Sequence, residues 1–165
     1  MTRKDKQYGD WEWFTFVPDK LTTQDAFSGY NYFPHHYRVQ VKTTIIASSP
    51  DTCVALAVHV QDFEGRQNFD ICVDGNWYYG HCDTQCKTWT QMDSGQLPSV
   101  KTSHLISMDV SANIIVLSID NKPVASEHDS MYETTNQLGF SLYGNEDTKE
   151  VNTVLLSDFS YQPEP

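Results

Sequence analysis

The chain has 165 residues, a length that fits one domain. Lys and Arg number 11 against 22 Asp and Glu, which gives a formal net charge of −11 and a sequence pI of about 4.7. A surface this negative repels phosphate groups, which argues against nucleic acid and anionic membrane surfaces as partners. The hydrophobic fraction of 39% is enough for a core, and no apolar run approaches the roughly 18 residues of a membrane-spanning helix.

The two ends of the chain are polar. The first residues, Met1 to Lys6, lack the apolar stretch of a signal peptide. We expect a polar N-terminal tail over residues 1–10, a single domain over 11–161 and a short C-terminal tail over 162–165. We also expect this segment to belong to a longer protein that is extracellular or exposed at the cell surface, with no insertion of this segment into the membrane.

Alternation of apolar and polar residues predicts strands in the first half of the chain. The clearest runs cover residues 37–45, 53–61 and 68–73, followed by 76–79 and 87–92. Asp74-Gly75 predicts a two-residue hairpin turn, because both central positions of a type I′ turn need a positive φ.

The second half of the chain continues in the same way. Runs at 106–110 and 115–119 are followed by a turn at residues 120–122, and further runs lie at 138–142 and 151–161. Sustained helical periodicity is missing. The fold class that this predicts is all-β, an antiparallel β-sandwich or barrel.

The predicted turn at Asp74-Gly75 also fixes which side chains share a face. A two-residue loop places Cys72 opposite Trp77 and Asp70 opposite Tyr79, and opposed residues lie on one side of a sheet. Aromatic rings beside polar groups are typical of a sugar-binding site, because rings stack on pyranose faces while polar groups bind hydroxyls. The predicted ligand-binding residues are Asn68, Asp70, Trp77 and Tyr79, with His59 and Gln61 from the preceding strand.

Two features leave this prediction open. Aromatic residues at alternating positions lie in a core more often than on a binding surface, in which case Trp77 and Tyr79 belong to the core. A shift of one residue in the register would also move them to the opposite face.

The four cysteines allow more than one arrangement. Cys53, Cys72, Cys82 and Cys86 permit two disulfides in three connectivities, or four thiols. The strand register makes a bond between Cys53 and Cys72 plausible, which leaves Cys82 with Cys86. Cys82, Cys86 and the adjacent His81 suggest zinc, but a second closely spaced pair of ligands is missing, so we favour disulfides.

Catalytic and cofactor motifs are missing from the sequence. There is no phosphate-binding glycine loop, nucleophile elbow or His-Glu-X-X-His motif. Asp70 has no second carboxylate two positions away, as glycoside cleavage by paired acids would need. Acidic stretches at residues 5–10, 19–25 and 146–147 could bind calcium, but their spacing matches no known loop, and we expect no cofactor.

Three segments in the last third of the chain resemble the concanavalin A-like lectin/glucanase superfamily. Asn113–Val124 (NIIVLSIDNKPV) resembles a hairpin of that superfamily, Leu138–Gly144 (LGFSLYG) its next strand, and Val154–Tyr161 (VLLSDFSY) its closing strand. The resemblance implies a jelly roll of two curved sheets, and within the superfamily it is greatest to small bacterial binding or sensor domains. The Glu-X-Asp-X-X-Glu signature of the glucanases and the metal-binding motif of the legume lectins are absent, so the resemblance implies neither hydrolysis nor a metal.

Three functions follow as hypotheses. The first is a non-catalytic module that binds carbohydrate on the concave sheet face. The second is a protein-interaction or extracellular sensor domain without a sugar ligand. The third is an unconventional hydrolase that uses Asp70 and His59.

Overall fold

A computed structural model describes the chain in nine stretches. These are residues 6–8, 11–15, 36–47, 52–61, 65–83, 88–99, 102–131, 137–143 and 153–163. Every regular element in them is a β-strand. The strands extend beyond the predicted domain limits of 11–161, because the first begins at Lys6 and the last ends at Pro163.

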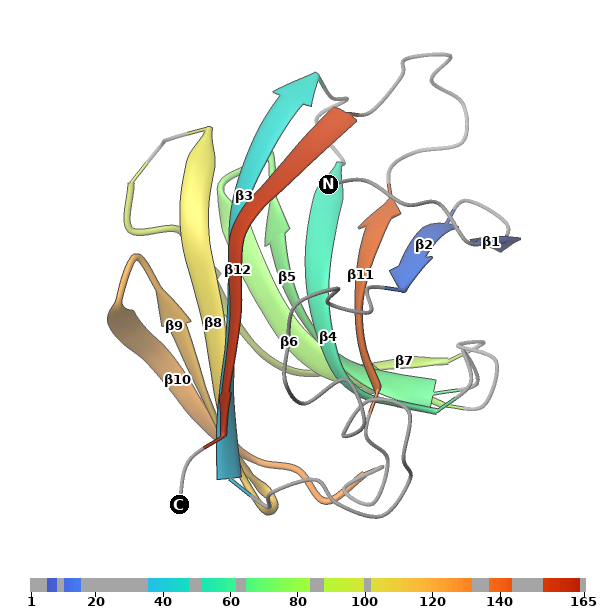
Figure 1. Cartoon of the computed structure of the whole chain (residues 1–165), viewed down its shortest axis with the longest axis vertical. Helices are drawn as coiled ribbons and strands as arrows, with labels where there is room; N and C mark the ends of the chain where they lie inside the picture. Colours follow the sequence, from blue (N-terminus) through green and yellow to red (C-terminus); the bar gives the residue numbers. More distant parts are fainter. Residues whose placement is uncertain are drawn as a thin grey trace.

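The strands form two antiparallel sheets that face one another (Figure 1). The larger sheet has seven strands in the order β1 (Lys6–Tyr8), β2 (Trp11–Thr15), β11 (Gln137–Tyr143), β4 (Cys53–Gln61), β5 (Gly65–Cys72), β6 (Asn76–Cys82) and β7 (Trp89–Gln96). The smaller sheet has five, in the order β10 (Lys122–His128), β9 (Ile114–Ile119), β8 (Ser103–Ser111), β3 (His36–Ala47) and β12 (Thr153–Pro163). The predicted all-β sandwich is therefore confirmed.

The core lies between the two sheets, and it is built by the alternation that the sequence shows. We call the side of the larger sheet that faces the smaller sheet its inner face, and the opposite side its outer face. The inner face carries Val54, Leu56 and Val58 of β4, which pack against apolar residues of β3 and β8. Strands β4 to β6 bend along their length, so the outer face is concave (Figure 1).

The hairpin between β9 and β10 turns within the predicted residues 120–122, but its turn has two residues and Lys122 already belongs to β10. Ile119 pairs with Lys122, and the two residues between them, Asp120 and Asn121, have φ of 51° and 63°. Asp and Asn tolerate this left-handed region better than most residues, which is why they occupy a type I′ turn.

The hairpin between β5 and β6 differs from its prediction by one residue. Its loop has three residues, Val73 to Gly75, and Gly75 alone has a positive φ, 88°. Gly75 donates its backbone N–H to the carbonyl of Cys72, which closes a β-turn. Three-residue loops commonly consist of such a turn followed by one left-handed residue.

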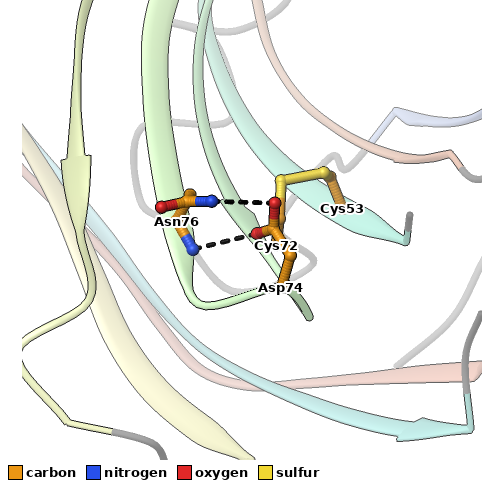
Figure 2. Close-up of a disulfide and its surroundings, with 4 residues drawn as sticks. All are labelled: Cys53, Cys72, Asp74 and Asn76. Carbon is orange, nitrogen blue, oxygen red and sulfur yellow. Dashed lines mark hydrogen bonds between the residues drawn. A yellow bond between two sulfur atoms is a disulfide. The ribbon is translucent and has the colours of Figure 1, made fainter. Parts of the chain in front are cut away.

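The side chain of Asp74 holds this longer loop in place. One carboxylate oxygen accepts the backbone N–H of Asn76 at 2.9 Å, and the other accepts its side-chain amide at 2.8 Å (Figure 2). The consequence is a register in which Ile71 pairs with Trp77 and Phe69 with Tyr79. Each β6 residue is thus shifted by one position relative to the predicted pairing.

A disulfide joins β4 to β5 at the same end of the sheet (Figure 2). Cys53 and Cys72 are directly opposed in the register, with Cα atoms 4.0 Å apart, as the sequence suggested. The bond closes a segment with a sequence separation of 19, for which chain-entropy estimates give about 3 kcal/mol of stabilisation.

Gly95 provides a test of the observed register. It is opposite Trp77, and a Cβ at this position would lie 2.7 Å from two atoms of the indole ring. We expect Gly95→Ala to lower the free energy of unfolding by about 1–3 kcal/mol, as overpacking in a core does. Chemical denaturation measures the effect, with Ser94→Ala on the exposed side of the same strand as the control. Equal stability of the two variants would contradict the packing of Trp77 against Gly95.

Candidate functional site

The two aromatic residues predicted as a sugar platform lie in the core. Trp77 is 4% exposed and Tyr79 is 0% exposed, and both belong to the cluster between the sheets. The Trp77 ring meets Phe69 edge to face, with centroids 6.0 Å apart. The predicted face of these two residues was wrong, because the three-residue turn places them on the inner face instead of the outer one.

Asn68 and Asp70 lie on the outer face, as expected, but apart from the two rings. They alternate with Phe69 and Ile71, which point into the core. Asn68 is fully buried, and its side-chain oxygen accepts a hydrogen bond from Nε of Arg66 at 3.1 Å. Its amide nitrogen has no hydrogen-bond partner among the residues that the structure describes. The outer face of β5 therefore offers a run of polar groups, Arg66, Asn68 and Asp70, each no more than 5% exposed.

An aromatic residue outside the predicted set lies on the same face. Trp89 is on the outer face of β7, opposite Cys82, and 38% of it is exposed. A Cβ on Gly80 would come within 2.8 Å of the Trp89 ring, so the indole packs directly over this glycine. Gly80 in turn pairs with Asn68. A flat, half-exposed ring is thus placed two strands from the polar run of β5.

Two further residues on the outer face of β6 and β7 are at least partly accessible. Tyr78 is half-buried between Asp70 and Ser94, and Gln91 is exposed and donates a hydrogen bond to Ser94 at 3.3 Å. The accessible groups on this face are thus two rings, an amide and a hydroxyl, a combination suited to a sugar. The polar groups of β5 lie buried beside them. The available signal for Trp89 was a single tryptophan within a strand of otherwise mostly polar residues, where no core is available to bury it.

His59 is on the inner side of the sheet, contrary to its predicted place. The pairing of β4 with β5 is interrupted between Val58 and Gln61, and His59 has a φ of 51°. This β-bulge turns the imidazole toward the core, where it meets Tyr37 at a centroid distance of 6.3 Å and bonds to Gln67. Gln61 pairs with Gly65 through its backbone, and its side chain lies outside what the structure describes.

His59 belongs to a buried polar network that ties the end of β10 to the larger sheet. The Gln67 amide donates to the backbone carbonyls of Asp129 and Met131, at 3.2 and 2.8 Å. The Asp129 carboxylate accepts the Tyr79 hydroxyl at 3.2 Å and lies 3.0 Å from Nδ1 of His81. Burial, and next the negative charge of Asp129, raise the pKa of Tyr79, so its hydroxyl stays protonated and serves as a donor.

This arrangement separates the two residues of the hydrolase hypothesis. Asp70 is on the outer face and His59 faces the core, so the sheet lies between them. The zinc interpretation also fails, because Cys82 is disulfide-bonded and His81 is paired with Asp129. Cys86 and most of the predicted acidic calcium stretches lie outside the described residues.

The described residues lack two features that would point to a membrane or to a metal. They contain no helix long and apolar enough to cross a membrane. They also contain no group of three or more His, Cys, Asp or Glu side chains arranged to hold a metal ion.

Comparison with known proteins finds similarity at the level of structure. No protein-family model matches the sequence, and no curated protein matches it. The carbohydrate-binding module CBM66 of Bacillus subtilis superposes with a TM-score of 0.65 at 11% identity, over 78% of this chain and 75% of that one. Sheep galectin-11 gives 0.57 at 12% identity, over 78% and 91%. A prokaryotic β-1,3-1,4-glucanase from a mouse hindgut metagenome gives 0.60 at 12% identity, over 80% and 68%.

The fold is a concanavalin A-like jelly roll. The three similar structures include binding proteins and an enzyme, so their common property is the architecture of two packed sheets. This confirms the fold that the C-terminal strand motifs indicated. A shared fold does not determine function, so the function of this chain has to be argued from the residues on its own outer face.

Replacing the buried amide at the centre of the network tests its role. We expect Gln67→Leu to cost about 2–4 kcal/mol of unfolding free energy, because it removes hydrogen bonds to His59 and to two backbone carbonyls. Urea denaturation gives the value, and Gln91→Leu on the exposed part of β7 is the control. A loss below about 0.5 kcal/mol, the usual range for surface substitutions, would show that the network contributes little.

Proposed function

We propose that this domain is a non-catalytic carbohydrate-binding module whose ligand stacks on Trp89. The observation that carries the proposal is the position of this ring: one side packs over Gly80, and the residue keeps 38% of its surface exposed on the concave face. An indole supported from below and open above offers a rigid apolar surface to a pyranose. The proposed ligand class is the predicted one, but the stacking residue is Trp89 instead of Trp77 and Tyr79.

The polar run on β5 supports the same ligand class. In the strand register, Trp89 is in line with Cys82 and Arg66, and Gly80 beneath the ring is in line with Asn68. Arg66 donates to Asn68, which orders both side chains at the floor of the face. Tyr78 and Gln91, nearer the surface, provide the hydrogen-bonding groups that can reach sugar hydroxyls.

The distribution of acids supports binding without hydrolysis. Among the described side chains of β4 to β7, Asp70 is the one carboxylate on the outer face, since Asp93 lies opposite the buried Tyr79 on the inner face. Cleavage by either usual glycosidase mechanism uses two carboxyl groups on opposite sides of the scissile bond. The glucanase signature is also absent from the sequence.

The disulfides support an extracellular or cell-surface location. The bond between Cys53 and Cys72 and the bonded state of Cys82 are typical of proteins that fold in an oxidising compartment. Polysaccharides and glycoproteins are abundant in that setting. A protein partner without sugar remains the alternative function, and the experiment below separates the two.

A glycan array of the wild-type domain, run with and without calcium, is the first test. We expect a specific glycan hit, and we expect Trp89→Ala to weaken binding of that glycan at least tenfold, because loss of a stacking contact worth more than about 1.4 kcal/mol has that effect. Isothermal titration with the glycan identified on the array measures the change.

The matched control is Leu155→Ala, which removes an exposed apolar side chain of the smaller sheet. It should bind as the wild type does. A blank array with a folded protein would favour the protein-interaction alternative. A hit that Trp89→Ala leaves unchanged would place the sugar elsewhere on the domain.

A further inference from the structure

Trp89 lies where a strand is normally least restrained. It is the first residue of β7, and β7 is the edge strand of its sheet, so its backbone pairs with β6 alone. Because 38% of the residue is exposed, core packing does not fix its ring either. The ends of edge strands fray when they have few contacts. A ring that stacks on a sugar from this position therefore needs a further restraint on its backbone.

That restraint lies one residue pair beyond Trp89. Cys82 is opposite Trp89 in the last pair of the ladder between β6 and β7. In the next pair outward, the backbone N–H of Asp83 donates to the backbone carbonyl of Thr88 at 3.1 Å. In return, Oδ1 of Asp83 accepts the backbone N–H of Thr88 at 2.8 Å. The carboxylate thus takes the place that a backbone carbonyl has in a hydrogen-bonded antiparallel pair.

The closure made by Asp83 is well suited to stop fraying. A hydrogen bond to an ionised carboxylate is roughly twice as strong as one between neutral groups. The adjacent Cys82 is 2% exposed and disulfide-bonded, which adds a covalent restraint at the residue opposite Trp89. On the other side of Trp89 the ladder continues through Thr90, which pairs with His81. The backbone of Trp89 is therefore held on both sides.

The position of the indole depends on this closure, because β6 and β7 approach one another closely beneath it. A Cβ on Gly80 would lie 2.2 Å from the backbone oxygen of Thr90 and 2.8 Å from the Trp89 ring. Only a residue without a side chain permits this approach. An outward movement of the start of β7 would separate the ring from Gly80 and release it into solvent.

We propose that Asp83 is a positioning residue for Trp89, because its carboxylate closes the ladder beyond Trp89 and so holds the indole over Gly80 before a ligand binds. This rests on the proposed function, in which Trp89 stacks on a sugar. A ring that is already ordered loses less conformational freedom on binding, so Asp83 adds affinity without contacting the ligand.

Fluorine NMR of protein labelled with fluorinated tryptophan tests the proposal without a ligand, and Trp89→Phe identifies the Trp89 resonance. We expect Asp83→Ala to move this resonance toward its position in the unfolded protein and to remove the protection of the Thr88 amide against hydrogen exchange. Asp83→Asn should keep most of both, because its side-chain oxygen also accepts an N–H. The control is Gln96→Ala, at the exposed far end of β7, which should behave as the wild type.

Affinity for the glycan identified on the array is the second measurement. Asp83→Ala should bind it about three- to tenfold more weakly, and Asp83→Asn should bind it nearly as the wild type does. The proposal is overturned if Asp83→Ala leaves the Trp89 resonance and the Thr88 protection unchanged, and equally if it changes both without any loss of affinity. Since the NMR and exchange measurements use no ligand, a blank array would count against the proposed function alone.

Discussion

The length of the turn between β5 and β6 decides which chemistry each face of the larger sheet carries. Side chains alternate along a strand, so a loop of three residues instead of two exchanges the faces of every residue that follows. Gly75 provides the single left-handed position and Asp74 binds the N–H of Asn76, which makes the three-residue form stable. Trp77 and Tyr79 consequently complete the core, and the concave face is left to β5 and Trp89.

The sequence was sufficient for the fold because the fold depends on patterns within single segments. Alternation predicted strands, and Asp120, Asn121 and Lys122 predicted a turn, of which the structure uses the first two residues. The Cys53–Cys72 pairing followed from two neighbouring strands. The site was less predictable, because it depends on the relative register of strands, and the sequence Val73-Asp74-Gly75 is compatible with either loop length.

Two further site residues show where single-sequence reasoning fails. His59 continues the alternation of β4 in the sequence, yet a bulge turns it inward, and bulges leave no reliable mark in a sequence. Trp89 is easily taken for a core residue, since most tryptophans are largely buried. Its position over Gly80 depends on the neighbouring strand, a contact that no pattern within one segment contains. Which side chains meet on the concave face therefore depends on how β5, β6 and β7 pair with one another.

The irregular edges of the two sheets have a consequence for solubility. Edge strands expose unpaired backbone groups that invite other chains to add to the sheet, and bulges are one way in which natural proteins prevent it. The pairing of each of β7, β10 and β12 with its neighbour is interrupted by a register shift. Together with a net charge of −11, these interruptions disfavour edge-to-edge pairing of sheets from two copies of the chain. A domain with Trp89 exposed on such an edge can thus present an aromatic surface without polymerising through it.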